Sequence, residues 1–323
     1  MKYKAAAVIT SALIVILSGC GGKKSFSNSS VYVHANEYIE SSGKPESLYA
    51  ESYYEEESQA SVSIPSNKPN GSSKPTSAKI PQSSIAPRET VRVTIPEGYT
   101  ISQIGDLFAG KKVCSKADFM EAISDTDFSK YYPFVNNIPK NNERCYRLEG
   151  YLYPDTYEFY TGMSAEDAIG KLLRGAGDKL IGKYSHSKLS FDQIVTLASI
   201  IEKEVANDAE MKKVSSVFHN RLNINMKLQA DSTINYIERY VKPNLTGDKD
   251  RFNSFYNTYK CAALSAGPIC SPSTNALKAA INPAETEYLF FASDKAGKYY
   301  YAKTYEEHLE NCKAADITEE KSE

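Results

Sequence analysis

Residues 190–204 read SFDQIVTLASIIEKE, and the interpretation of the whole chain starts from this stretch. Ser190 and Gln193 have the spacing of a capping box, which predicts the first turn of a helix. Apolar residues then follow at helical intervals and define a buried stripe, namely Ile194, Leu197, Ala198, Ile201 and Val205. The stretch therefore predicts a buried helix with two carboxylates at its end.

The two carboxylates belong to Glu202 and Glu204, and periodicity alone does not choose between them. At about 100° per residue, one lies roughly 80° to one side of the buried stripe and the other roughly 80° to the opposite side. A glutamate on a helix is most often a surface residue. Larger apolar side chains, Leu197 and Ile200, flank Glu204. The residues that flank Glu202, Val195 and Ala198, are smaller. Burial among larger apolar groups favours the protonated carboxyl that a general acid needs, so the comparison favours Glu204.

The composition excludes several classes of protein. The chain has 323 residues, of which 41% are hydrophobic and 24% charged, as in soluble globular proteins. The net charge of −2 gives no electrostatic footprint for nucleic acid. The four histidines are widely spread, and no metal-ligand spacing or glycine-rich phosphate loop is present. The sequence predicts neither a metal nor a cofactor.

The first 20 residues have the layout of a secretory signal peptide, with lysines, a short apolar segment and small residues at the end. Residues 17–20 read LSGC, which is typical of a bacterial lipobox. The alternative is an ordinary signal peptide with a chance cysteine. The pattern predicts that Cys20 is lipidated and anchors the protein at the outer face of the cytoplasmic membrane.

Residues 21–88 are rich in Ser and Pro and poor in aliphatic residues, which predicts a disordered tether. A flexible coil of this length spans on the order of 45 Å. Residues 316–323 form a short charged tail. Sequence does not fix the pairing of the other cysteines; Cys261 with Cys270 and Cys114 with Cys145 are two possibilities.

The region between tether and tail divides into two parts. Residues 89–146 predict a strand at 91–95 and two helices, the first capped by Thr100 and the second at 117–124. This unit resembles a LysM module, with sugar-binding and structural roles both open. Residues 147–315 predict helices at 163–180, 190–204 and 211–223 and a closing hairpin of 288–293 and 298–304. The expected fold class is α+β.

Two polar clusters lie in the second part. One contains Gln229, Asp231 and Ser232, and the other is the Tyr-Asn-Thr-Tyr segment at 256–259. Donors, acceptors and aromatic faces suit a carbohydrate groove. The same residue types also perform capping and turn chemistry everywhere in proteins.

Seven motifs together give a family resemblance. They are LEGYLYPDTYEF (148–159), LASIIEKE (197–204), KVSSVFHNRL (213–222), LQADSTINY (228–236), YNTY (256–259), GPICSP (267–272) and NALKAAINP (275–283). Over about residues 90–315, the chain resembles the YceG-like endolytic murein transglycosylases. The resemblance implies cleavage inside peptidoglycan glycan strands, between N-acetylmuramic acid and N-acetylglucosamine, that leaves 1,6-anhydro ends.

The resemblance also implies roles for individual residues. Glu204 is the second glutamate of the EKE motif and would act first as acid and then as base. The groove would be lined by Glu149, Gln229, Asp231, Ser232, Tyr256, Asn257 and Tyr259. Asp231 would orient Glu204 or stabilise positive charge, while Glu202 would belong to the helix surface or to a structural ion pair. Peptidoglycan synthases are implied partners.

The chain departs from the family pattern in three places. A lipid anchor replaces the common transmembrane helix, and the tether replaces a first LysM-like unit. The usual Gly-Leu-Pro-Pro-Gly-Pro loop reads Ala-Leu-Ser-Ala-Gly-Pro at 263–268, which should loosen it. A non-catalytic peptidoglycan-binding lipoprotein and a solute-binding lipoprotein are therefore the alternatives to an active transglycosylase.

Overall fold

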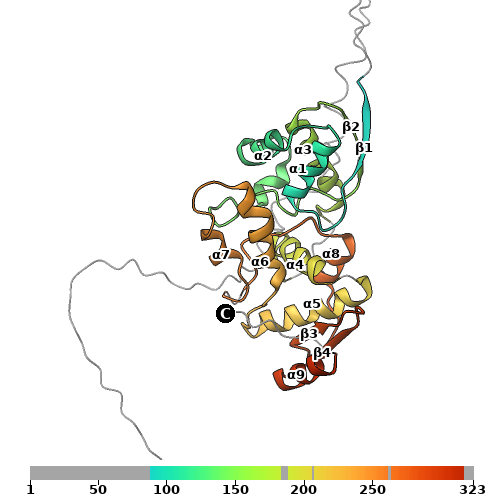
Figure 1. Cartoon of the computed structure of the whole chain (residues 1–323), viewed down its shortest axis with the longest axis vertical. Coiled ribbons are helices and arrows are strands. Elements are labelled where there is room, and N and C mark those ends of the chain that lie inside the picture. The colour runs from blue at the N-terminus through green and yellow to red at the C-terminus, as the bar shows by residue number, and fades with distance from the viewer. Residues whose placement is uncertain (1–87, 183–187, 206, 261–262, 316–323) are drawn as a thin grey trace, which may run out of the picture. The chain divides into compact units, whose positions relative to one another are not determined.

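The structure is a computed structural model that describes residues 88–182, 188–205, 207–260 and 263–315 (Figure 1). The predicted signal peptide, Cys20, nearly all of the predicted tether and the charged tail lie outside the described residues. All described residues fall within one compact unit. Within them, no helix has both the length and the apolar character needed to cross a membrane.

The first part of the chain builds a small sheet covered by helices. Strand β1 (Thr90–Thr94) pairs antiparallel with β2 (Thr156–Tyr160). Helices α1 (Ile101–Gly110) and α2 (Lys116–Asp125) lie between them in sequence, and α3 (Ala165–Lys179) follows and packs on α2. The sheet thus joins residues on both sides of the boundary predicted at 146/147, and the division of 89–315 into two domains stays a prediction.

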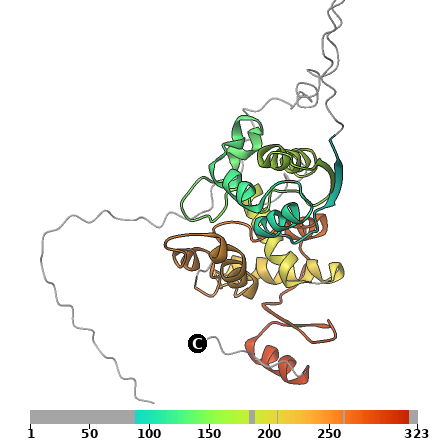
Figure 2. The same ribbon diagram turned by 45° about the horizontal axis from the view of Figure 1, so that its top comes forward.

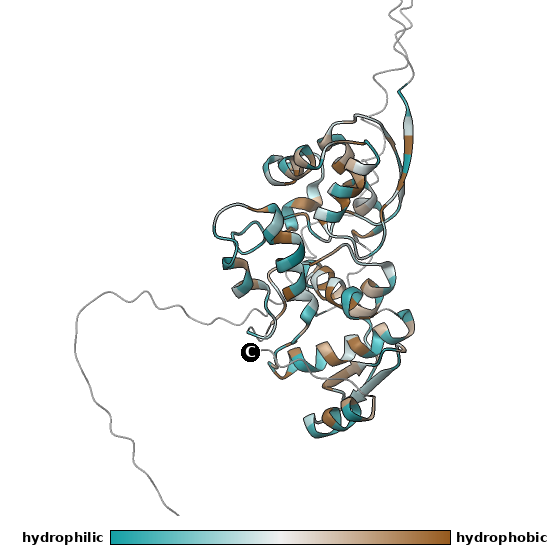
Figure 3. Cartoon of the chain, in the orientation of Figure 1, coloured by the Kyte–Doolittle hydropathy of each residue, from teal (hydrophilic) through white to brown (hydrophobic). Residues whose placement is uncertain are grey.

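Helix α4 (Phe191–Glu204) lies inside a group of helices (Figure 1). It contacts α5 (Asp208–Asn223), α6 (Asp231–Tyr236) and α8 (Thr274–Ile281). Every residue from 194 to 201 is buried, because these partners cover the helix on several sides. The alternation of hydrophobic and hydrophilic residues along α5 in Figure 3 is that of an amphipathic helix with one solvent face.

The last part is a hairpin and a helix. Strands β3 (Phe290–Ser293) and β4 (Tyr299–Ala302) pair antiparallel, and α9 (Tyr305–Ala314) packs against both of them (Figure 2). The predicted closing hairpin is confirmed. Helix α7 (Arg251–Tyr256) and short helical turns at 128–130, 133–137, 237–241 and 242–244 complete the described elements.

The sequence signals for helix starts are confirmed in detail. Thr100 and Ser190 each form a capping box with the glutamine three residues later. Asn207 caps α5 by accepting a hydrogen bond from the N–H of Ala209. The predicted α+β fold class is confirmed as well, because in the described residues two small antiparallel sheets accompany a mainly helical structure.

The cysteines give no support to either disulfide considered from the sequence. Cys114, Cys145 and Cys270 are free thiols. Cys261 lies outside the described residues.

Candidate active site

Glu204 is the last residue of α4, where its side chain meets the first turn of α6. The helix ends here because Val205 adopts an extended backbone conformation. The carboxylate is half-buried and accepts a hydrogen bond of 3.2 Å from the N–H of Ser232. Burial raises the pKa of Glu204, the negative charge of Asp231 raises it further, and the hydrogen bonding from Ser232 opposes both. Glu204 therefore keeps its proton to a higher pH than an ordinary glutamate.

The turn before α6 has an unusual backbone. Gln229 has a φ of +51°, which is uncommon outside glycine and often marks a functional segment. Thr258 holds this turn from the neighbouring segment: its carbonyl accepts from the N–H of Gln229 at 3.2 Å, and its hydroxyl accepts from the N–H of Ala230 at 2.9 Å. The turn therefore fixes where α6 begins and where the N–H of Ser232 points.

A buried arginine holds the same turn from the other side. Arg221 is 7% exposed and donates to the carbonyls of Leu228 at 2.7 Å and Leu289 at 2.6 Å, and to the side chain of Gln229 at 3.4 Å. Burial lowers its pKa to about 10, so it remains charged at neutral pH. This residue joins the Gln229 turn to the start of β3.

Asp231 and Tyr259 form a polar pair beside Glu204. The hydroxyl of Tyr259 donates to the carboxylate of Asp231 at 2.6 Å. Burial and the nearby charges of Asp231 and Glu204 raise the pKa of Tyr259, so its hydroxyl keeps its proton. The carboxyl of Glu204, the exposed carboxylate of Asp231 and the hydroxyl of Tyr259 thus lie close together.

Glu202 points to a different neighbour, as its position on the opposite side of the helix stripe predicts. Its carboxylate accepts a hydrogen bond of 3.0 Å from the N–H of Ser273, the residue that caps α8. A carboxylate near a helix N-terminus is stabilising. Glu202 therefore ties α4 to α8, through a backbone hydrogen bond rather than the ion pair considered from the sequence.

Two residues expected in the groove lie in the interior instead. Glu149 is 1% exposed and Tyr256 is 0% exposed. The carboxylate of Glu149 accepts from the N–H of Ile101 and from the hydroxyl of Tyr236, while the ring of Tyr256 packs on the ring of Tyr236. Their burial does not fit the prediction that they line a groove, and both have structural contacts.

The remaining predicted site residues lie at or near the surface. Gln229 and Asp231 are exposed, and Ser232, Asn257 and Tyr259 are partly buried. The side chain of Asn257 accepts from the N–H of Tyr259 at 2.9 Å, which is the turn chemistry weighed from the sequence. The structure brings Glu204 together with Gln229, Asp231, Ser232 and Tyr259, and leaves out Glu149 and Tyr256.

The loop at 263–268, whose sequence departs from the family pattern, packs against the rest of the protein at the C-terminal end of the loop. The N–H of Ala266 donates to the carbonyl of Phe255 at 3.0 Å, and Gly267 and Pro268 are buried. Beyond it, the hydroxyl of Ser199 in α4 accepts from the N–H of Ile269 at 3.0 Å. The loop is thereby fastened to the helix that carries Glu204.

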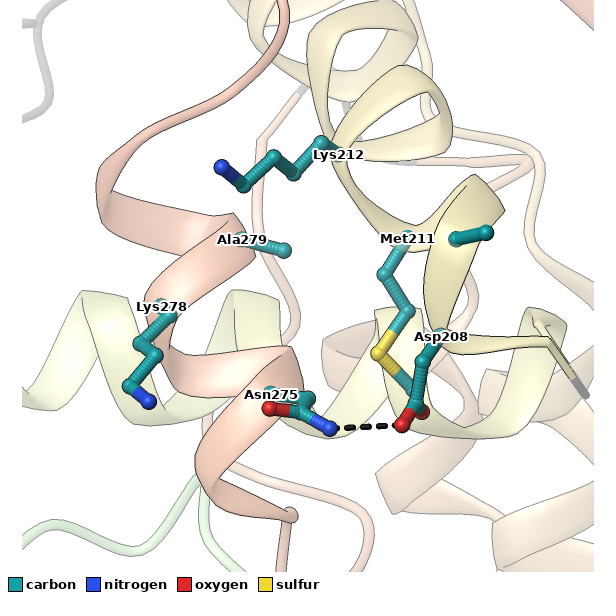
Figure 4. Close-up of a pocket in the computed structure, with 7 residues that line it drawn as sticks. Asp208, Met211, Lys212, Asn275, Lys278 and Ala279 are labelled. Atoms are coloured by element: carbon teal, nitrogen blue, oxygen red, sulfur yellow. Dashed lines mark hydrogen bonds between the residues drawn. The ribbon is translucent and has the colours of Figure 1, made fainter.

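A cavity of about 350 Å³ lies elsewhere, between α5 and α8 (Figure 4). Asp208 and Asn275 meet at one end of it through a hydrogen bond of 2.5 Å, and Lys212 and Lys278 lie on its walls. Its lining includes none of the residues that the structure brings together around Glu204, namely Gln229, Asp231, Ser232 and Tyr259. The protonation chemistry and this cavity are therefore separate features.

Sequence reasoning missed Arg221 and Tyr299, which support the backbone of the site. Tyr299 in β4 donates its hydroxyl to the carbonyl of Glu204 at 3.3 Å. Arg221 bonds to carbonyls, which every residue has, so no pairing pattern reveals it. The arrangement as a whole can offer a proton from Glu204 and a negative charge from Asp231 to one bound molecule.

Comparison with known proteins places this chain in a family. A profile of the YceG-like family matches residues 69–314. An endolytic murein transglycosylase of Streptococcus pneumoniae serotype 2 (strain D39) is 35% identical over 247 residues, which cover 70% of this chain and 45% of the relative. One of Bacillus subtilis strain 168 is 32% identical over 226 residues, with coverages of 67% and 63%.

A solved structure is similar too. The crystal structure of a YceG-like protein from Listeria monocytogenes is 37% identical and has a TM-score of 0.61, covering 68% of this chain and 75% of that one. This chain spans 45% to 63% of the length of the curated relatives named above. The match of the family profile over residues 69–314 establishes that the chain belongs to the YceG-like family.

Proposed function

We propose that the protein is an endolytic peptidoglycan lytic transglycosylase, with Glu204 as its catalytic acid and base. The observation that carries the proposal is a half-buried carboxyl with a raised pKa, fixed by the N–H of Ser232, in a chain whose relatives are named endolytic murein transglycosylases. A raised pKa lets a carboxyl keep, to a higher pH, the proton that general acid catalysis needs.

The reaction needs only one group that changes protonation. Protonated Glu204 donates to the glycosidic oxygen as the bond from C1 of N-acetylmuramic acid breaks and positive charge develops on the sugar. The resulting carboxylate then removes the proton of the C6 hydroxyl, whose oxygen forms the new bond to C1. The attack is intramolecular, which gives it a large advantage of proximity. No water is consumed, so the second carboxylate of a hydrolase has no obligatory place.

Neighbouring residues have supporting roles in this proposal. Asp231 is exposed beside Glu204 and supplies negative charge to the developing cation. Tyr259 holds that carboxylate through its hydroxyl. Gln229 and Asn257 offer polar groups for sugar hydroxyls, whereas the hydroxyl of Ser232 is buried.

The products test the proposal directly. Purified peptidoglycan incubated with the protein should release fragments that end in 1,6-anhydro-muramic acid, each lighter by one water than a hydrolysis product. Mass spectrometry of the soluble fraction makes this distinction. Reducing ends would indicate a hydrolase instead. Binding to the wall without release would favour the non-catalytic lipoprotein, for which the altered 263–268 loop is the supporting observation.

The pH dependence tests the role of Asp231. The rate should fall as pH rises through the pKa of Glu204, because the acid form is lost. The charge of Asp231 raises that pKa. The Asp231→Asn variant should therefore lose activity at a lower pH than the wild type, whatever its absolute rate. Glu287→Gln removes an exposed carboxylate elsewhere and should leave the profile in place. An unmoved profile in Asp231→Asn would contradict the assigned coupling.

The location is part of the same proposal and rests on the sequence. The lipobox at 17–20 supports a lipid on Cys20 and a position at the outer face of the cytoplasmic membrane. The tether of residues 21–88 would let the catalytic part reach glycan strands in the wall, beside peptidoglycan synthases. Metabolic labelling with a fatty acid, compared between wild type and Cys20→Ala, tests the anchor.

A further inference from the structure

Glu149 is a fully buried carboxylate that the proposed reaction does not use. It lies between α1 and α6 and joins them. Its two oxygens accept from the N–H of Ile101, the first residue of α1, at 3.1 and 3.3 Å, and one oxygen also accepts from the hydroxyl of Tyr236 at 2.9 Å. Tyr236 is the last residue of α6. One side chain thus connects the start of one helix to the end of another.

The same short helix reaches Glu204 at its other end. Helix α6 has six residues, about 9 Å of rise, and its second residue is Ser232. The N–H of Ser232 donates to the carboxylate of Glu204. The backbone stays helical from Asp231 through the turn at 237–241, so Ser232 and Tyr236 lie on one helical segment, and we expect a displacement at Tyr236 to reach the contact with Glu204.

The burial of Glu149 sets the direction of its pH response. Burial raises the pKa of Glu149 to about 7, and hydrogen bonds from Tyr236, Ile101 and Gly150 and the charge of Lys203 limit the rise. Other titratable groups that face it have their own pKa values raised by burial and by its charge; they are Cys145, Tyr146, Tyr236, Tyr256 and Cys270. The ionised form of Glu149 is therefore less favourable in its buried site than it would be in water.

We propose that Glu149 is a positioning residue that makes the seating of α6, and with it the contact between Ser232 and Glu204, dependent on pH. Protonated Glu149 keeps α6 seated against α1. Ionised Glu149 favours an opening of α6 that hydrates the carboxylate. The consequence for catalysis rests on the proposed function, whereas the opening itself does not.

Linkage fixes the sign and the range of the effect. The carboxyl binds its proton more tightly when α6 is seated than when it is open. Seating is therefore most favoured below the ordinary pKa of 4.5, and the advantage is lost as pH rises towards about 7. For one proton, the opening equilibrium rises by at most about tenfold per pH unit in this interval.

Hydrogen exchange of the α6 amides measures this opening. Glu204 also has a raised pKa and contacts α6, so the experiment uses Glu204→Gln as its parent and thereby silences that group. Exchange of residues 231–236 is followed from pH 5 to pH 8 and corrected for intrinsic exchange rates. The parent should show a rise of at most about tenfold per pH unit up to about pH 7. Adding Glu149→Gln should remove the pH dependence, because the amide does not titrate.

Two further variants keep the test sharp. Glu97 is another carboxyl with a raised pKa, before α1, and it has no hydrogen bond to α6. Glu97→Gln is thus a matched control that should leave the α6 profile unchanged. Tyr236→Phe keeps the carboxyl but removes a hydrogen bond that lowers its pKa, so the rise should continue to higher pH. This second variant decides the matter if Glu149→Gln fails to fold.

The outcomes separate the two proposals. The positioning role would be overturned if Glu149→Gln left the pH dependence of α6 hydrogen exchange unchanged. It would also be overturned if Glu97→Gln abolished that pH dependence. Failure of the wild type to release anhydro products would overturn the proposed function but would leave the exchange result standing. In an active enzyme, Glu149→Gln should also lose less of its rate between pH 5 and pH 7 than the wild type does.

Discussion

Replacing Glu204 with glutamine should abolish release of anhydro-muropeptides, with a rate loss on the order of 10² to 10⁴. Glutamine keeps the shape of the side chain and an oxygen for the N–H of Ser232, so the fold should survive. It cannot deliver a proton to the glycosidic oxygen or accept one from the C6 hydroxyl. Because one group performs both steps of the proposed reaction, the loss should lie near the upper end of that range.

The matched control lies two residues away on the same helix. Glu202→Gln keeps an acceptor for the N–H of Ser273 and removes only a charge near the start of α8. We expect about the wild-type rate and a loss of stability of about 1 kcal/mol or less. Release of soluble fragments over time, with thermal melting of each variant, provides the comparison. Activity that survives in Glu204→Gln and disappears in Glu202→Gln would reverse the assignment.

The helix signals around these glutamates were readable because they are local. A capping box spans four residues, and a buried stripe repeats within two turns, so Ser190, Gln193 and the apolar positions define α4 without knowledge of the fold. The flanking residues of Glu204 also indicated burial, and burial is the main cause of its raised pKa. The hairpin of β3 and β4 was equally local.

The interior contacts were not readable from spacing. Glu149 bonds to Ile101, 48 positions before it, and to Tyr236, 87 positions after it. A glutamate in a conspicuous motif has the same appearance whether it faces a groove or a core. Arg221 likewise depends on which carbonyls the fold brings near it. The pairing of β1 with β2 joins residues 62 to 70 positions apart, and the sequence left the second strand unassigned.

Replacing Gly150 with alanine should be among the most destabilising single substitutions in the described chain. Gly150 has a φ of +83°, a conformation that costs an L-residue about 1 to 2 kcal/mol. An added Cβ would lie 2.5 Å from the Cβ of Pro268 and 3.0 Å from Val195 in α4. Neither neighbour is the end of a flexible side chain. Overpacking of this kind costs about 1 to 3 kcal/mol more, so we expect a total loss of about 2 to 5 kcal/mol.

Gly162→Ala separates backbone strain from the clash. Gly162 has a φ of +67°, and an added Cβ there would meet nothing within 4 Å. Its substitution should therefore cost only the strain of about 1 to 2 kcal/mol. Chemical denaturation of both variants gives the two free energies of unfolding. Equal losses would show that the 267–268 segment yields to the new methyl group. A larger loss in Gly150→Ala would show that Pro268, beside the altered loop, is held firmly against the helix that carries Glu204. The substituted loop would then be rigid where it meets α4, because contacts with that helix rather than its own glycine and proline content restrain it.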